Sequence, residues 1–320
     1  MMKRTTSLGA AAIALLVLLR VPFAGAETLI VGKSLATAEP ELAANIGAEL
    51  GIFKRHGLDL KILDFHGGGS LAQGMAAGDI DIADGSGTEM ADIGKGVPMM
   101  AVCENTGPLS FLSIGVPFDS PIHSADGLKG KKVGMTSAGS LTEWLVKELE
   151  RKKGWPAGAI TTTSLGGSTA GIIAAMRLHL VDAFIGGTNQ VLNLQDKRIA
   201  RLLMPVTEFE GSMASGVLFA SNHLIATKPE ALRAFLAAWI ETIGYIRTHK
   251  AETVRIESRI TGFDEAVMAR NYDITIGMWI KDCRFDAPSL ATLERSFIDL
   301  KLVTTPPDMS KLYTEAFLPK

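Results

Sequence analysis

Short apolar runs alternate with longer segments in which apolar residues recur every three or four positions. The apolar runs between residues 29 and 103 have the composition of buried strands, and the segments between them have helical spacing. This alternation predicts a parallel sheet with helices on its faces. The predicted strands cover residues 29–32, 58–65, 80–83 and 99–103, and the helices between them cover 39–50, 70–77 and 86–94.

The pattern changes at residues 109–117, where an apolar run is followed by Pro117 and Pro121, and the alternation then restarts. Residues 215–220 form another apolar run, which we interpret as the return of the chain to its first sheet. The remaining segment is helical, and residues 229–250 have a strong amphipathic pattern. The restarted alternation predicts strands at 132–135, 160–165, 182–185 and 201–206, with helices at 140–153 and 169–178.

Two α/β lobes follow from this interruption. Lobe I is expected to contain residues 27–112 and 216–320, and lobe II residues 113–215, with hinge crossings near 109–117 and 211–220. The predicted fold class is α/β, each lobe being a mostly parallel sheet flanked by helices. Ligands of open α/β sheets bind beyond the carboxyl ends of the strands. Two such ends that face each other would form a cleft, which a hinge between the lobes could close.

The N-terminus has the pattern of a secretory signal peptide. Two basic residues precede an apolar run at residues 8–19, which is shorter than a typical transmembrane helix. An Ala-Gly-Ala cleavage site ends at Ala26, so residues 1–26 are predicted to be removed, and no cysteine stands there to carry a lipid. An uncleaved membrane anchor is the alternative, but Arg20 interrupts the apolar stretch. The prediction is export to a bacterial periplasm.

Composition narrows the class of protein. The 320 residues suffice for two lobes with their own cores, and the formal net charge of −2 gives no reason to expect nucleic acid or an anionic membrane as a partner. Cys103 and Cys283 would share an oxidising compartment. Both a disulfide and two separate buried thiols are compatible with the sequence. No Cys-x-x-Cys motif or His/Cys cluster indicates a metal site.

The joint between a predicted strand and the next helix is clearest at residues 131–151. Ser140 and Glu143 form a capping box at the start of this helix, whose apolar residues lie on one face. A helix N-terminus offers free backbone N–H groups that suit small polar or anionic ligands. The two side chains can also satisfy those N–H groups themselves. Joints rich in Gly, Ser or Thr recur after the other predicted strands, which favours a binding role for the set.

Three blocks of sequence resemble a known family. Residues 49–60 (ELGIFKRHGLDL), 70–83 (SLAQGMAAGDIDIA) and 129–140, with Lys-Gly-Lys-Lys-Val-Gly and Ser-Ala-Gly-Ser, are similar to periplasmic solute-binding proteins of the NMT1/THI5-like group. That group includes the sulfonate, taurine and nitrate binders of ABC importers. The resemblance implies a type II periplasmic binding fold, capture of a small molecule between the lobes, and delivery to an inner-membrane permease.

The resemblance also implies that ligand contacts come from the loops after the strands. Small residues in the matching loops offer backbone N–H groups, hydroxyls and amides without a fixed charge. Each of them could instead cap a helix or shape a turn. The candidate ligand-binding residues are Ser34, Thr37, Gly68, Ser70, Ser86, Gly87, Thr88, Thr106, Ser137, Gly139, Ser140, Gly167, Ser168, Thr169, Gly187, Thr188 and Asn189.

The sequence leaves the charge of the ligand open. No arginine occurs in these loops to clamp a carboxylate, although neutral donors and helix ends can hold an oxyanion. Lys33 is adjacent to the first loop and is expected to be solvated. Trp144 lies on an apolar stripe, so a core position is expected for it rather than stacking on a ligand. Acidic residues are as near and could bind a cationic group, although Glu89 is expected in a second capping box with Ser86: Glu39, Asp84, Glu89 and Glu104.

No catalytic motif is evident. The sequence has neither a G-x-S-x-G elbow nor a G-x-x-x-x-G-K-[ST] loop, and its six histidines lack ligand spacing. We therefore predict a monomeric binding protein without catalytic residues, cofactor or metal. A secreted enzyme and a ligand-sensing module are the alternatives, because a fold does not fix a function. The ligand could be a sulfonate, an aromatic or other small acid, a nitrate-like anion or a pyrimidine-type heterocycle.

Overall fold

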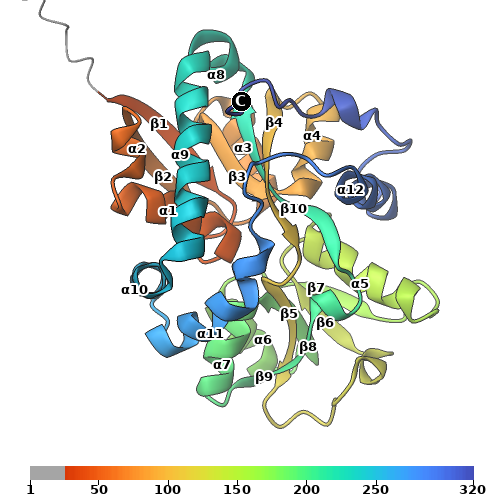
Figure 1. The fold of residues 1–320 in the computed structure, drawn as a ribbon. Helices are drawn as coiled ribbons and strands as arrows, with labels where there is room; N and C mark the ends of the chain where they lie inside the picture. The colour runs from red at the N-terminus through yellow and green to blue at the C-terminus, as the bar shows by residue number, and fades with distance from the viewer. Residues whose placement is uncertain (1–25) are drawn as a thin grey trace, which may run out of the picture.

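The computed structural model describes residues 26–320, which form two α/β lobes one above the other (Figure 1). Each lobe is built on one five-stranded sheet flanked by helices, as the alternating pattern predicts. The predicted signal peptide, except for its last residue, lies outside the described residues. Among the helices of residues 26–320, none combines the length and apolar composition that crossing a membrane requires.

The first sheet has the strand order β2-β1-β3-β10-β4. Its first three strands are parallel, whereas β10 runs antiparallel to both of its neighbours. The strands are β1 (Glu27–Lys33), β2 (Leu58–Asp64), β3 (Ile82–Ser86), β4 (Met99–Pro108) and β10 (Ser212–Ser221).

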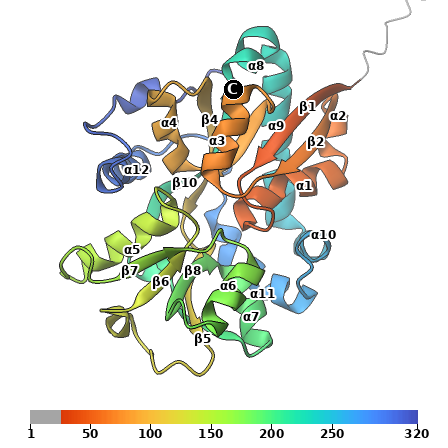
Figure 2. The same cartoon turned by 180° about the vertical axis from the view of Figure 1, so that it is seen from behind.

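The second sheet has the order β7-β6-β8-β5-β9, so the antiparallel strand again occupies the fourth position. Its strands are β5 (Leu112–Pro117), β6 (Lys132–Met135), β7 (Thr161–Ser164), β8 (Ala183–Gly187) and β9 (Ala200–Pro205). The helices that follow these strands lie around the sheet, as the view from behind shows (Figure 2). They are η3 (Ala125–Leu128), α5 (Leu141–Lys152), α6 (Thr169–Arg177), α7 (Thr188–Asp196) and η4 (Val206–Glu208).

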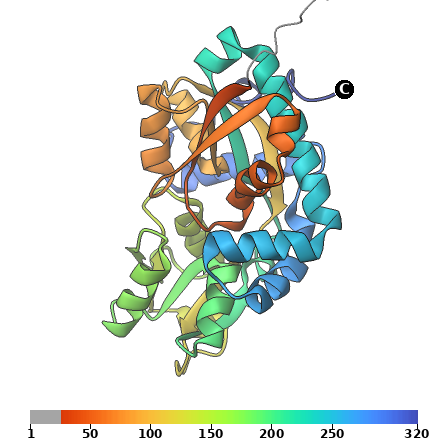
Figure 3. The ribbon, with the colours of Figure 1, turned by 90° about the vertical axis from the view of Figure 1, so that its left-hand side faces the viewer.

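The helices outside this central segment belong mainly to the first lobe. They are η1 (Glu39–Glu41), α1 (Leu42–Glu49), α2 (Ile52–Arg55), α3 (Gly68–Ala77), η2 (Gly87–Glu89), α4 (Met90–Gly94), α8 (Asn222–Thr227), α9 (Pro229–Thr248), α10 (Lys250–Thr261), α11 (Glu265–Thr275), η5 (Ile276–Met278), α12 (Ala287–Asp299) and η6 (Met309–Lys311). The side view shows α10 and α11, in light blue, where the two lobes meet, and α11 packs against α7 (Figure 3).

The chain crosses between the lobes twice. It passes from β4 to β5 through residues 109–111 and returns from β9 to β10 through residues 206–211. The predicted crossings, 109–117 and 211–220, are longer because their apolar residues belong to β5 and β10, which each pair with strands on both sides. The expected boundary between residues 215 and 216 therefore falls inside β10. Short connections of this kind suit a hinge.

The predicted helix at residues 39–50 is divided. Pro40 stands in its first turn, where η1 precedes α1. Proline donates no backbone hydrogen bond, so the regular helical ladder starts only after it. This division directs the side chains of Glu39 and Glu41 toward the interior, where both are buried.

The core position predicted for Trp144 is confirmed. Its side chain is fully buried, and its indole Nε1 donates to Asp299 Oδ2 on α12 at 3.0 Å. A buried indole N–H normally has such a partner. This contact joins α5 of the second lobe to α12 of the first.

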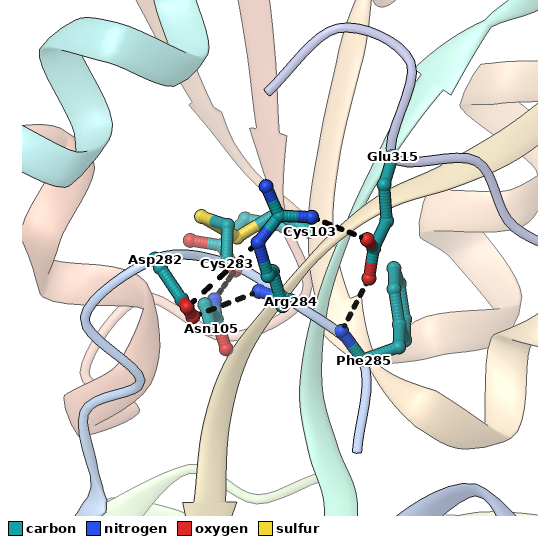
Figure 4. The surroundings of a disulfide bond; sticks show 8 residues. Cys103, Asn105, Asp282, Cys283, Arg284, Phe285 and Glu315 are labelled. Carbon is teal, nitrogen blue, oxygen red and sulfur yellow. Dashed lines mark hydrogen bonds and ion pairs between the residues drawn. A yellow bond between two sulfur atoms is a disulfide. The ribbon is translucent and has the colours of Figure 1, made fainter. Parts of the chain in front are cut away.

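Cys103 and Cys283 form a disulfide, with their Cα atoms 4.5 Å apart (Figure 4). The bond attaches the segment before α12 to β4. Glu315 strengthens this attachment because it accepts from Arg284 Nη1 at 2.7 Å and from the Phe285 backbone N–H at 3.0 Å. Glu104, next to Cys103, accepts from the Asp286 N–H at 2.9 Å. The last part of the chain is therefore fixed to β4, the strand at one edge of the first sheet.

Removing this disulfide should destabilise the protein. We expect the Cys103→Ala/Cys283→Ala variant to lose about 2–5 kcal/mol of unfolding free energy, because the bond closes a long loop in the unfolded chain. Urea unfolding with and without a reductant measures the loss. The reductant should destabilise the wild-type protein and leave the double variant unchanged; equal wild-type curves in both conditions would contradict the prediction.

Candidate ligand-binding cleft

A cavity of about 100 Å³ lies between the two lobes. The segments that line it follow β1, β2 and β3 of the first sheet and β6, β7 and β8 of the second. These strands are the parallel members of their sheets, so both lobes direct the carboxyl ends of parallel strands at the same space. This is the position at which open α/β sheets bind ligands.

Several candidate residues line this cavity, and they come from both lobes. Glycine at these positions lets backbone approach the cavity closely, and the serine and threonine hydroxyls add neutral donors and acceptors. The candidates in the lining are Ser34, Thr37, Gly68, Ser86, Ser137, Ser140, Gly167 and Gly187.

The other candidates lie outside the lining, and several of them complete turns or helix starts. Ser70 accepts from the His66 N–H, and Ser168 caps α6 by accepting from the Gly171 N–H. Thr188 donates to the Ser110 carbonyl, and Asn189 donates to the Thr37 carbonyl at 3.0 Å. The candidates outside the lining are Ser70, Gly87, Thr88, Thr106, Gly139, Ser168, Thr169, Thr188 and Asn189.

The capping box at α5 forms with a change of partner. The Ser140 hydroxyl accepts from the Glu143 N–H at 3.4 Å, as predicted. The Glu143 carboxylate, however, accepts from the Gly139 N–H at 2.7 Å. The second capping box, expected between Ser86 and Glu89, is wrong, because the Ser86 side chain makes no capping bond and donates instead to Glu89 Oε2 at 2.6 Å.

Three carboxyl groups form an acidic wall on the side of the first lobe. Glu41 accepts from the Ser34 hydroxyl at 2.5 Å and from the Leu35 N–H at 2.7 Å. Glu39 accepts from Asn271 Nδ2 at 2.7 Å. Glu89 completes the wall, and all three residues line the cavity although they are at least nine-tenths buried.

Lys33 is buried, so the expectation of a solvated ammonium is wrong. Its side chain is 1 % exposed, and its Nζ lies 3.1 Å from Asp64 Oδ1 and donates to the Ala36 carbonyl at 3.1 Å. The residue ends β1 beside the first loop but does not line the cavity. Its positive charge pairs with Asp64 and also lowers the pKa values of the buried Glu41 and Asp84, against the larger effect of their burial.

The second lobe supplies an apolar wall opposite the acidic one. Gln190 stabilises this side because its amide donates to the Gly167 carbonyl at 2.9 Å and accepts from the Gly187 N–H at 3.1 Å. In the sequence, nothing distinguishes these apolar residues from ordinary core positions. The apolar lining residues on this side, from the crossing at Phe111 onward, are Phe111, Leu112, Met135, Leu141, Leu165, Ile172 and Ile185. They alternate with Thr136, Ser137, Ser140 and Thr142, and the first lobe adds Leu35, Ala38 and Pro40 to the lining.

The sequence of the chain matches one family model, described as NMT1/THI5 like, over residues 42–253. This match covers every strand of both sheets except β1, and every lining segment except residues 34–41. The chain belongs to the NMT1/THI5-like family. No curated protein sequence matches it.

Solved structures resemble this NMT1/THI5-like protein at low sequence identity. The alkanesulfonate-binding protein SsuA of Xanthomonas axonopodis pv. citri, bound to MOPS, is 17 % identical, with a TM-score of 0.76 over 90 % of this chain and 98 % of that one. The aliphatic sulphonate binding protein SsuA of Escherichia coli is 20 % identical, with a TM-score of 0.72 over 90 % and 97 %. The nitrate-binding protein NrtA of Synechocystis PCC 6803 is 16 % identical, with a TM-score of 0.70 over 91 % and 86 %. These likenesses establish the periplasmic binding protein fold.

In this NMT1/THI5-like protein, burial has the largest effect on the pKa values of the three glutamates in the acidic wall. It raises the pKa of Glu39 to about 7, of Glu41 to about 8 and of Glu89 to about 7, and hydrogen bonds to the carboxyl groups offset only part of the effect. The pKa of the neighbouring Asp84 is also well above its ordinary value, chiefly through burial and then through the charge of Glu41. The wall therefore retains protons at a pH where exposed carboxyl groups have lost them.

The stability of the empty protein should fall as the pH rises through this range. The Glu41 pKa is about 8 in the folded protein against an ordinary 4.5, so the stabilising proton is fully present below pH 4.5 and is lost as the pH approaches 8. Glu41→Gln stays neutral at every pH. Its unfolding free energy should fall less steeply between pH 5 and 8 than that of the wild type, by at most about 1.4 kcal/mol per pH unit. The exposed Glu265→Gln serves as the control, and parallel wild-type and Glu41→Gln curves would refute the assignment.

Gly68 gives room to Glu89, and its neighbour Gly69 provides a matched comparison. A Cβ at Gly68 would collide with Glu89 Oε1, whereas a Cβ at Gly69 meets nothing within 4 Å, and both glycines lie in α3. We expect Gly68→Ala to be about 1 kcal/mol less stable than Gly69→Ala, because Glu89 must move and loses its bond from Ser86. Chemical denaturation measures the difference; equal stability of the two variants would show that the Glu89 carboxyl is not held there.

Proposed function

We propose that this chain is the solute-binding component of an ABC importer. It captures a small organic or oxyanionic solute in the cleft between its lobes, closes by a hinge and delivers the solute to an inner-membrane permease. The observation that carries the proposal is one cavity lined by both lobes, with only two short connections between those lobes. The family and the shared fold support it. The protein acts in the periplasm as a monomer, after removal of its signal peptide behind Ala26.

Contacts across the cleft support hinge closure. Asn189 of α7 donates to the Thr37 carbonyl in the first lobe at 3.0 Å. At the edge of the lobes, Arg270 of α11 lies 2.7 Å from Asp196 at the end of α7. Bonds of this kind form only when the lobes approach each other, so they stabilise the closed arrangement around a bound solute.

Capture rather than conversion of the solute is favoured by the chemistry of the lining. Its titratable side chains are the three glutamates of the acidic wall, and no cysteine, histidine or lysine accompanies them among the described lining residues. The Ser34 and Ser86 hydroxyls donate to Glu41 and Glu89, but among the described lining residues no histidine joins them to form an acyl-transfer triad. The enzyme alternative is distinguished by conversion of the solute, whereas a permease gene beside the gene of this protein would disfavour the sensor alternative.

A thermal-shift screen against a metabolite library tests the proposal. A solute that binds the folded protein should raise its melting temperature by mass action, and mass spectrometry should recover that solute unchanged after incubation. A converted solute would favour the enzyme alternative. The absence of any stabilising solute in the screen would remove the support for capture.

The Asn189→Ala variant tests the closure contact. Loss of the bond to Thr37 should weaken affinity for the solute found in the screen by about 2–10-fold, because a hydrogen bond contributes about 0.5–1.5 kcal/mol. The variant should fold normally, and its affinity is measured by titration calorimetry. The exposed Asn222→Ala in α8 is the matched control. Unchanged affinity in Asn189→Ala would mean that the bond from Asn189 to Thr37 does not stabilise the closed, solute-bound protein.

A further inference from the structure

We propose that the cleft selects a small organic cation, one that carries N–H donors on an apolar body, in preference to a sulfonate, a nitrate or another anion. An amine, an amidine or a protonated amino-heterocycle has this chemistry. The inference rests on the proposed function, since it concerns the solute that the same cavity captures.

The charge of the residues that line the cavity is the first argument for a cationic solute. Glu39, Glu41 and Glu89 line the cavity, and no arginine, lysine or histidine is present among its described lining residues. The ammonium of Lys33 does not line the cavity; its Nζ lies 3.1 Å from Asp64, and its positive charge also acts on Glu41 and Asp84. An anion in this cavity would meet three carboxyl groups without a positive partner, whereas a cation would supply the missing one.

The backbone N–H groups of the cleft are the second argument, which does not depend on how many acidic residues line the cavity. An oxyanion would need free N–H groups at the loops and helix starts. The Leu35 N–H already donates to Glu41, the Gly139 N–H to Glu143, and the Gly187 N–H to Gln190 Oε1. Oxygen atoms of the protein therefore already accept from the Leu35 and Gly187 N–H groups of the lining and from the Gly139 N–H beside it.

Glu89 provides an acceptor for the cation. Its side chain is 8 % exposed and lines the cavity. Oε2 accepts from the Ser86 hydroxyl, and backbone N–H groups of Ser86 and Glu89 also favour the ionised carboxylate, but within the described residues no side chain donates to Oε1. Oε1 lies over Gly68, which also lines the cavity. A buried carboxylate oxygen without a side-chain donor is suited to an N–H group of a ligand.

The opposite wall selects the apolar body. The seven apolar residues of the second lobe face the acidic wall across a cavity of about 100 Å³. That space accommodates a single ring or a short alkyl chain while the lobes are in contact, because most ligand sites for larger molecules exceed roughly 300 Å³. A solute with a cationic end and a compact apolar end complements both walls. The carboxyl groups do not form a cluster that could hold a metal ion within the described residues.

Proton exchange gives the proposal a characteristic pH dependence. The groups that face Glu89 are Glu41, Asp84 and Asp92, and those that face Glu41 are Lys33, Asp84 and Glu89. Glu39 faces Glu257. Burial holds protons on this wall near neutral pH, and a bound cation favours the ionised carboxylates. Binding should therefore release protons, and affinity for a cation should rise from pH 6 to pH 8.5.

Matched probes test the preference. Thermal shift and calorimetry would compare benzamidinium, benzylammonium and protonated 4-aminopyridine with benzamide, and with benzenesulfonate and benzoate. We expect the cations to raise the melting temperature, with proton release when calorimetry is repeated in buffers of different ionisation enthalpy. Stronger stabilisation by the anions, an affinity for cations that falls with pH, or stabilisation by calcium or magnesium chloride alone would overturn the inference.

The Glu89→Gln variant tests the acceptor. At pH 8 it should bind the best cationic probe at least tenfold more weakly than the wild type and keep its affinity for benzamide. The control Glu265→Gln, at an exposed position of α11 outside the lining, should change the affinity by less than about twofold. Equal binding of the cation by Glu89→Gln and the wild type would overturn the assignment of Glu89 as the acceptor. If the variant does not fold, proton release on cation binding by the wild type decides whether the carboxyl groups bind the cation.

The two proposals fail in different ways. If no cationic probe stabilises the protein but another solute of the metabolite library does, the charge preference is wrong and solute capture stands. If no solute of either set stabilises the protein, solute capture itself fails.

Discussion

Backbone N–H groups at the carboxyl ends of the strands have to find acceptors, because an unpaired donor in a buried cleft is costly. This chain meets the requirement with its own side chains, most clearly where Glu41 accepts from Leu35 and Glu143 accepts from Gly139. The carboxyl groups of the acidic wall are buried at the same place, and burial raises their pKa values. The contacts that complete the loops thus also set the electrostatic character of the cavity.

The architecture was predictable because hydrophobic periodicity is a local property. Strands and helices could be recognised one at a time, and the interruption near residue 109 marked the passage to a second sheet. The loops of the site were predictable for the same reason, since a cleft in this class of fold lies beyond the strand ends. The choice of residue within each loop was not, as Gly187 and Thr188 illustrate: the first lines the cavity, while the second turns to Ser110.

The acidic wall depends on contacts that are distant in sequence. Glu39 is held by Asn271, which is 232 positions away, and no local pattern connects the two. Glu41 stands near the start of a helix, where an acidic residue ordinarily favours the helix dipole from the surface. The pairing of Cys103 with Cys283, across 180 positions, could not be predicted from local sequence patterns either. Sequence analysis could therefore place the cleft but not its charge.

The disulfide has a topological consequence. All five strands of the second sheet lie between Cys103 and Cys283 in the chain, so that lobe is contained within a single covalent ring. One proteolytic cut in either segment that connects the lobes opens this ring without separating the molecule into two pieces. A nicked protein of this kind keeps both halves of its cleft covalently tethered.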